Sequence, residues 1–199
     1  MTAVLTKDEA VRFLSSGEVV AVPTDTVYGL AASLAHPGAV AELFAMKQRP
    51  TSVALPVLAD SIDSIQGLGV SWDDGASRLS DVFWPGALTI VVAVPAELAE
   101  LVGSTDGSVG FRVPRDEVLR DVLVACGPLA VSSANEHGRE PCHSAVEVVR
   151  QFSNSHLVGV LDGGDRAAAV STVVRVDHGT LEVLRQGSVS LVDLENAFD

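Results

Sequence analysis

Short runs of β-branched residues alternate with amphipathic segments along this chain, and this alternation narrows the choice of fold more than any other feature. Such runs occur, among other places, at residues 19–22, 88–94 and 157–161. Apolar residues make up 47% of the sequence but aromatic residues only 5%, so the core has to be built mainly from Val, Leu, Ala and Ile. Strand-like runs that alternate with helical segments are typical of an α/β domain rather than of a helical bundle.

The expected organisation is one domain over residues 1–199, because a chain of this length buries roughly 70% of its unfolded surface around a single core. No internal repeat, linker or low-complexity tract is visible. No apolar run approaches the roughly 20 residues of a membrane span, and the N-terminus lacks the pattern of a secretory signal. Cys126 and Cys142 make no disulfide framework. These features predict a cytoplasmic protein that does not bind membranes.

The net charge is −13, from 26 acidic and 13 basic residues. A surface of this sign repels phosphate backbones, so tight binding to bulk nucleic acid is not expected. None of the five histidines sits in a nucleophile or metal motif, and no Walker-type loop occurs. The sequence therefore predicts no metal site, and any ATP would be held outside the common phosphate-loop folds.

The stretch at residues 21–30 reads Ala-Val-Pro-Thr-Asp-Thr-Val-Tyr-Gly-Leu and predicts a ligand site at the end of a strand. Pro23 ends the strand because it has no N–H to donate, and Thr24, Asp25 and Thr26 follow it directly. In open α/β sheets, ligands bind beyond the carboxyl ends of the strands. The alternative is an ordinary turn, since Thr and Asp also favour turns for local reasons.

A helix is predicted from Pro37 to about Lys47, because proline fits the first helical position and apolar residues then recur at helical spacing. Pro50 biases Arg49 away from helical geometry. Lys47 and Arg49 can therefore turn toward one point, and two cations there indicate an anionic ligand. The alternative is that they satisfy the last helical carbonyls.

Two further polar features belong to predicted strands. Arg112 lies inside a strand at residues 109–113, where it must either pair with an acid or bind a carboxylate or phosphate, because burying an unpaired arginine is costly. Residues 128–131 run into Ser132-Ser-Ala-Asn135, whose N–H and O–H groups could cradle a phosphate. An ordinary Ser/Asn turn is the alternative for this second feature.

The remaining elements follow from spacing, caps and turn residues. Thr6 with Glu9 three residues later predicts a capped helix, Trp84 is expected to pack on the sheet rather than to contact a ligand, and a hairpin should turn at Asp177-His-Gly179. Further helices are predicted at residues 6–14, 61–69, 74–82, 95–101, 116–125, 144–152 and 192–197, and further strands at 53–58, 88–94, 157–161, 170–176 and 180–185.

Together the motifs resemble those of the YrdC-like family, the threonylcarbamoyl-AMP synthases. The resemblance runs from about residue 10 to 188 in the family's order, and each motif is weak alone whereas the ordered set is specific. The motifs are Pro23-Thr-Asp-Thr-Val-Tyr-Gly-Leu30, Lys47-Gln-Arg-Pro50, Trp84-Pro-Gly-Ala-Leu-Thr89, Gly110-Phe-Arg-Val-Pro114, Ser132-Ser-Ala-Asn135, Ser171-Thr-Val-Val174 and Leu184-Arg-Gln-Gly187. The resemblance implies an α/β fold with a single twisted, concave mixed sheet, flanking helices and one large cavity.

The same resemblance implies an activity. L-Threonine, bicarbonate or CO2, and ATP would be converted into threonylcarbamoyl-AMP and pyrophosphate, which a downstream transferase would use to modify adenosine 37 of tRNA. Mg²⁺ is implied by the pyrophosphate leaving group, and Lys47 and Arg49 would be the catalytic cations. The implied ATP-binding residues are Lys47, Arg49, Ser108, Ser133, Asn135 and Arg185, and the implied threonine-binding residues are Thr26, Arg112 and Ser171.

Four positions depart from the residues usual in that family, namely Val53, Leu58, Asp116 and Arg175. Two other functions stay open. One is a YrdC-like nucleotide- or RNA-binding factor without synthase activity. The other is carbamoyl-adenylate chemistry like that of the related domain in hydrogenase-maturation proteins, which usually belongs to a longer chain with acylphosphatase and zinc-finger segments that this sequence does not show.

Overall fold

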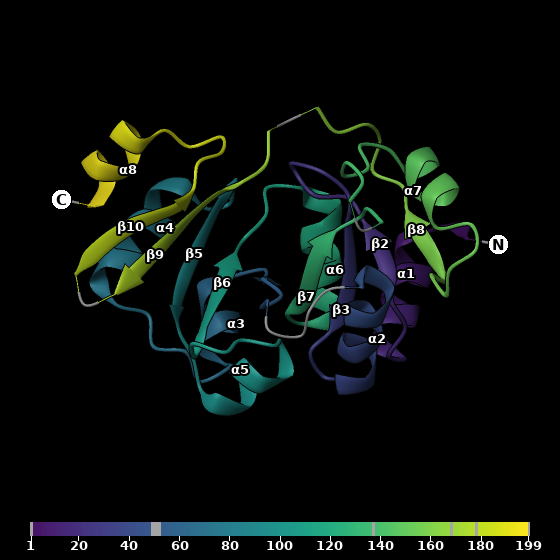
Figure 1. Ribbon diagram of the computed structural model, residues 1–199, viewed down its shortest axis with the longest axis horizontal. Helices are drawn as coiled ribbons and strands as arrows, with labels where there is room; N and C mark the ends of the chain where they lie inside the picture. The colour runs from purple at the N-terminus through teal and green to yellow at the C-terminus, as the bar shows by residue number, and fades with distance from the viewer. Residues whose placement is uncertain (1, 49–52, 137, 168, 178, 199) are drawn as a thin grey trace.

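The computed structural model describes residues 2–48, 53–136, 138–167, 169–177 and 179–198. Within these residues, ten strands form one twisted mixed sheet with helices packed along it, as the sequence predicts (Figure 1). In the same part of the chain, no helix has both the length and the apolar composition that crossing a membrane would require.

The order of the strands across the sheet is β1-β8-β2-β3-β7-β4-β6-β5-β9-β10 for the described residues. The β1–β8, β8–β2, β4–β6 and β5–β9 pairs are parallel, and the other neighbours are antiparallel. The strands are β1 (Ala3–Leu5), β2 (Val20–Val22), β3 (Gly29–Ser33), β4 (Val57–Leu58), β5 (Leu88–Ala93), β6 (Ser108–Arg112), β7 (Leu129–Ser133), β8 (Gly159–Leu161), β9 (Thr172–Asp177) and β10 (Thr180–Arg185).

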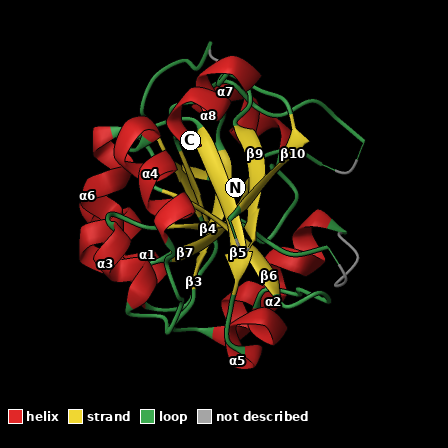
Figure 2. Ribbon diagram, turned by 90° about the vertical axis from the view of Figure 1, so that its left-hand side faces the viewer, coloured by secondary structure: helices red, strands yellow, loops and turns green. Residues whose placement is uncertain are grey.

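Helices lie on both sides of the strands (Figure 2). They are α1 (Lys7–Ser15), α2 (Pro37–Lys47), α3 (Ile62–Gln66), α4 (Asp74–Phe83), α5 (Ala96–Leu101), α6 (Glu117–Cys126), α7 (Ala145–Gln151) and α8 (Leu191–Phe198).

The sheet divides into two halves that meet at β4. One half holds β1, β8, β2, β3 and β7 with α1, α2, α6 and α7, and the other holds β6, β5, β9 and β10 with α3, α4, α5 and α8 (Figure 1). Only Val57 and Leu58 of β4 pair with both neighbouring strands, so the ladder that joins the halves is short. Predicted site residues come from both halves, because β7 ends at Ser133 and β6 ends at Arg112.

Local sequence signals set several of the helix ends. At the start of α1, the Thr6 hydroxyl accepts the Glu9 N–H at 3.3 Å and Glu9 Oε2 accepts the Thr6 N–H at 2.9 Å, which confirms the capping box. Pro37 begins α2, which ends at Lys47. The carboxylate of Asp116 accepts the Leu119 N–H at 2.8 Å and so caps α6.

Three strands differ from the sequence-based expectation. β1 was not predicted, because three residues at the sheet edge carry too little pattern. β3 was missed because its sequence, Gly-Leu-Ala-Ala-Ser, contains no β-branched residue, yet it lies buried between β2 and β7. The strand expected from residue 53 begins only at Val57, because Pro56 has no N–H for the ladder.

Trp84 is half-buried and packs against the core, which confirms the structural role predicted for it. Its Nε1 donates to the carbonyl of Leu88 at 2.7 Å, and its ring lies 5.3 Å from that of Trp72, centroid to centroid. The Trp72 ring in turn makes an edge contact with Phe111, which is fully buried. The rings of Trp84, Trp72 and Phe111 therefore pack together beside β5 and β6.

Candidate active site

A cavity of about 650 Å³ lies between the two halves of the sheet. Its walls come from β3 and β7 on one side and from β5, β6, β9 and β10 on the other. Six of the residues predicted for the site line it, namely Thr26, Ser108, Arg112, Ser133, Ser171 and Arg185. The chain thus brings together residues that lie up to 159 positions apart in the sequence (residues 26 and 185).

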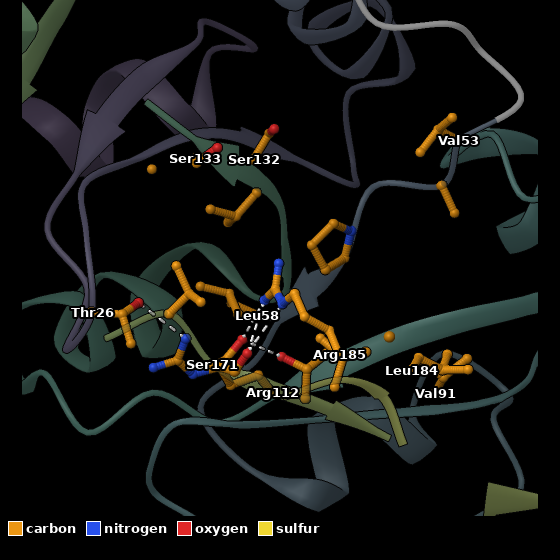
Figure 3. A pocket seen from close by; sticks show the side chains of 18 of the residues that line it. Thr26, Val53, Leu58, Val91, Arg112, Ser132, Ser133, Ser171, Leu184 and Arg185 are labelled. Carbon is orange, nitrogen blue, oxygen red and sulfur yellow. Dashed lines mark hydrogen bonds between the residues drawn. The ribbon is translucent and has the colours of Figure 1, made fainter. Parts of the chain in front are cut away.

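Five of these six predicted lining residues fall into two groups. Thr26, Arg112, Ser171 and Arg185 gather on one side of the cavity, and Ser133 lies across from them at the end of β7 (Figure 3). We call the first group the arginine side.

The turn between β2 and β3 forms part of the arginine side. The Thr24 hydroxyl donates to the Val27 carbonyl at 2.7 Å and accepts the N–H groups of Thr26 and Val27 at 3.1 and 3.3 Å. It also lies 3.0 Å from the Thr26 hydroxyl, and both threonines line the cavity. The stretch therefore forms the local turn, and the same residues also line the cavity.

Arg112 is paired with an acid and also lines the cavity. Its Nη2 donates to Asp25 Oδ1 at 2.6 Å, its Nε to the Gly86 carbonyl at 2.7 Å and its Nη1 to the Thr26 hydroxyl at 3.3 Å. The side chains of Arg112 and Asp25 are only 6% and 16% exposed. Both alternatives that the sequence left open are therefore compatible, since an acid neutralises the cation while its guanidinium still faces the cavity.

Arg185 stands beside Ser171 on the arginine side. Its Nη2 donates to the Ser171 carbonyl at 3.0 Å and to the Ser171 hydroxyl at 3.1 Å, and that hydroxyl lies 3.1 Å from the hydroxyl of Thr89. Among the described residues, no acidic side chain forms an ion pair with Arg185. Burial, and then the neighbouring Arg112 cation, lower the pKa of Arg185 below its ordinary value. Both effects penalise the positive charge, so an anion bound here would relieve them.

Arg175, one of the departures from the family pattern, forms an ion pair at the cavity wall. Its Nη2 lies 2.7 Å from Asp106 Oδ2. Hydrogen bonds from Ser108 and Ser104, together with the Arg175 cation, hold the pKa of Asp106 below its ordinary value. The Ser108 hydroxyl donates to Asp106 Oδ1 at 2.7 Å, so this predicted site residue is held by an acid that the sequence did not single out.

Lys47 holds the loop that follows β7. Its Nζ donates to the carbonyl of Ser133 at 2.8 Å, to Asn135 Oδ1 at 2.8 Å and to the carbonyl of Asn135. Ser133 Oγ donates to Asn135 Oδ1 at 2.6 Å. Lys47 is only 7% exposed, and these bonds tie the end of α2 to the predicted phosphate loop. Arg49, predicted as its catalytic partner, lies outside the described residues.

The other three positions that depart from the residues usual in the family occupy different environments. Val53 and Leu58 line the cavity, where they present apolar side chains. Asp116 is not among the described lining residues and instead pairs with Arg166 at 2.8 Å, with side chains 8% and 16% exposed. That buried pair anchors the loop after β8, which also binds the hydroxyl of Tyr28 through Gly163 N–H.

Thr89 and Asp106 are among the polar lining residues that sequence reasoning did not single out. Thr89 is a polar residue inside the apolar run 88–94, and this exception to the pattern was a usable signal. Asp106 lies in the polar loop before β6, where acids are common, so nothing in the sequence distinguished it.

The described cavity wall contains no Cys or His side chain. Cys142 is fully buried near the site, and burial followed by the charge of Glu147 raises its pKa to about 11. It therefore stays a neutral thiol near pH 7. The arrangement supplies cations and hydroxyl groups, which suits the binding and charge neutralisation of an anionic reactant better than covalent catalysis by a thiolate.

Comparison with known proteins identifies the family. The Sua5/YciO/YrdC family model, described as telomere recombination, matches residues 12–187. The chain belongs to this family. A protein of Mycobacterium tuberculosis is 40% identical to it over 182 residues, which cover 91% of this chain and 83% of that protein. The threonylcarbamoyl-AMP synthase of Photobacterium profundum is 33% identical over 187 residues, which cover 90% of this chain and 97% of that enzyme.

A solved Sua5 structure has the same fold as this member of the Sua5/YciO/YrdC family. The crystal structure of P. abyssi Sua5 complexed with L-threonine superimposes with a TM-score of 0.89 at 29% sequence identity. The match covers 96% of this chain and 56% of the Sua5 chain, so this chain spans little more than half of that relative's length.

Proposed function

We propose that this protein is an L-threonylcarbamoyladenylate synthase, an ATP-dependent nucleotidyltransferase. It takes L-threonine, bicarbonate or CO2, and ATP, and it forms threonylcarbamoyl-AMP and pyrophosphate. The observation that carries the proposal is the cavity itself. Hydroxyl groups and arginines on one side of the cavity face the serine loop that Lys47 holds on the other side. The family's named members include threonylcarbamoyl-AMP synthases and a Sua5 complexed with L-threonine.

The threonine subsite of the proposal is the arginine side. Arg112 would take the carboxylate, because an arginine presents parallel N–H donors to a planar anion. Thr26 and Ser171 would hold the polar atoms near it. Support comes from the hydrogen bond between Arg112 and Thr26 and from the position of all three residues in the cavity wall.

The nucleotide subsite of the proposal centres on the lysine-held loop. Ser133 and Asn135, with Lys47 behind them, would bind the phosphates, and Arg49 would join them from the segment after α2. Ser108 would contact the nucleoside. Arg185, with no acid partner among the described residues, would face the α-phosphate from the arginine side.

The chemistry needs positioning and charge neutralisation rather than a protein nucleophile. Bicarbonate supplies CO2 when it takes up a proton and loses water. The amine of threonine attacks CO2 and releases a proton to solvent, which gives a carbamate. A carbamate oxygen then attacks the α-phosphorus of ATP in line, and the bond from that phosphorus to the β-phosphate bridging oxygen breaks. Pyrophosphate leaves with the electron pair. Arg49 and Arg185 would stabilise the added negative charge at phosphorus directly, and Lys47 would add its positive charge from behind the serine loop.

Mg²⁺ remains an expectation for this reaction. Asp106 is the one carboxylate among the described lining residues, and it is already engaged by Arg175 and Ser108. The described residues contain no cluster of three or more potential ligands for a metal ion. The lining thus does not form a protein cage for Mg²⁺, and the ion would come coordinated by the phosphates of ATP.

The first prediction concerns the complete reaction. The protein should release pyrophosphate from ATP only when threonine and bicarbonate are both present, because the carbamate is the attacking group. The measurement is a coupled pyrophosphate assay with each substrate omitted in turn, together with mass detection of the adenylate. A protein that binds ATP and threonine but releases no pyrophosphate in the complete mixture would favour the binding-factor alternative.

The second prediction compares two arginines on neighbouring strands of the cavity wall. Arg185→Gln should lower kcat/KM about 100-fold, because it removes a cation that would face the developing charge. Arg175→Gln should lose far less, because Asp106 already neutralises that cation. Steady-state pyrophosphate release measures both variants. Equal losses would show that the total charge of the cavity matters, and not the position of Arg185.

A cytoplasmic location and a downstream tRNA threonylcarbamoyl transferase complete the proposal. Both cysteines are free thiols, as is usual in a reducing compartment. The unstable adenylate requires a protein that consumes it. Tight binding to bulk nucleic acid is not part of the proposed function, because the net charge of −13 opposes it.

A further inference from the structure

Three hydrogen bonds hold the Arg112 guanidinium, one of them to Asp25. A guanidinium carries five N–H donors. In the described part of the chain three of them have partners, namely Gly86 through Nε, Thr26 through Nη1 and Asp25 through Nη2. One donor on each terminal nitrogen is left, and a carboxylate is the ligand that takes two such donors side by side.

We propose that Asp25 is a positioning residue for the amino-acid substrate, and this rests on the proposed function. Asp25 does not belong to the described cavity lining, whereas its partners Arg112 and Thr26 do. It acts through Arg112, by holding Nη2 from behind so that the two remaining donors face the substrate carboxylate.

The local backbone makes Asp25 suitable for this role. Asp25 and Thr26 sit on the turn that the Thr24 hydroxyl closes, so both are held without help from Arg112. The turn belongs to the half of the sheet that contains β2 and β3, whereas Arg112 ends β6 in the other half. The Asp25–Arg112 pair therefore also fixes the arginine of one half against the turn of the other.

Two physical effects of Asp25 predict opposite results. If the acid only neutralised Arg112, removing its charge would leave the cavity more positive and would strengthen binding of the threonine carboxylate. If Asp25 instead orients Arg112, removing the charge of Asp25 weakens its hydrogen bond with Arg112 at 2.6 Å. The guanidinium can then turn, and binding of the substrate carboxylate weakens. The sign of the change in KM for threonine separates the two.

Asp116 provides a matched control. It forms a similarly buried pair with Arg166 at 2.8 Å but does not belong to the described cavity lining. Asp25→Asn and Asp116→Asn each weaken one buried ion pair, so each should lower the stability measured by urea unfolding. Only Asp25→Asn should change recognition of the amino acid.

The experiment measures KM for threonine and for ATP, and the preference for threonine over threoninamide, which lacks the carboxylate. We expect Asp25→Asn to raise KM for threonine about 10- to 100-fold, the loss typical of a hydrogen bond to a charged group. KM for ATP and turnover of threoninamide should stay close to wild type, so the preference for threonine falls. Asp116→Asn should keep the wild-type preference.

Asp25→Glu covers the case in which Asp25→Asn does not fold. It keeps the charge but moves the carboxylate by one methylene, so positioning predicts a raised KM for threonine and neutralisation predicts none. An unchanged or lowered KM for threonine in the folded variant, or an equal loss with threoninamide, would overturn the role of Asp25. If the wild type releases no pyrophosphate, the proposed function fails, and calorimetric titration of threonine into wild type and variant still decides whether Asp25 supports its binding.

Discussion

Replacing Lys47 with methionine should lower kcat/KM for pyrophosphate release by about 100- to 1000-fold, the cost of removing one preorganised donor from a charge-stabilising site. Methionine fills a similar volume but donates no hydrogen bond. The carbonyl of Ser133 and the amide oxygen of Asn135 would then lose the ammonium that holds them at 2.8 Å. The site would lose a cation and the fixed shape of its serine loop in one step.

The chain offers an unusually direct control for this variant, because Lys7 is its only other lysine. Lys7 lies on the surface, where its side chain is 48% exposed and pairs with Asp121. Lys7→Met should keep wild-type kcat/KM, since exposed pairs contribute little. Circular dichroism would establish that both variants fold. A folded Lys47→Met variant with near wild-type kcat/KM would contradict the role given to Lys47.

Replacing Arg112 with methionine should lower the free energy of unfolding by about 3–5 kcal/mol, because it leaves the largely buried Asp25 carboxylate without its cation. Urea unfolding followed by circular dichroism measures this loss. The double variant Arg112→Met/Asp25→Leu removes both charges and should regain most of the stability.

The double variant also separates stability from recognition. Its fold should be close to wild type, yet KM for threonine should stay high, because the donors for the carboxylate are gone. A double variant that remains as unstable as Arg112→Met would show that the pair is not the source of the loss. A double variant that uses threonine normally would rule out Arg112 as the carboxylate partner.

Much of the fold follows from the sequence, because the informative signals are local. The capping box at Thr6, the proline that begins α2 and the hairpin between β9 and β10 each involve neighbouring residues, and all three are confirmed. The elements that were missed lack such signals. β3 has no β-branched residue, and its strand conformation comes from pairing with β2 and β7.

The sequence predicts many of the residues that belong to the site, but it does not predict which of them form ion pairs with one another. Six predicted residues line one cavity, and all of them except Ser108 belong to the motifs quoted above. Which acid neutralises Arg112 depends on a contact with Asp25, 87 positions away. Arg175 likewise pairs with Asp106, 69 positions away. Such pairings come from tertiary structure, and the order of residues along the chain does not encode them visibly.

The strand order also has a consequence for synthesis on the ribosome. β8 lies between β1 and β2, and among the described residues β1 pairs with β8 alone. The first strand of the chain therefore cannot join the sheet until residue 161 has been made. At roughly 5–20 residues per second, this delay lasts many seconds. During that time residues 3–5 lack their strand partner, so co-translational assembly of the sheet cannot begin at the edge that β1 forms.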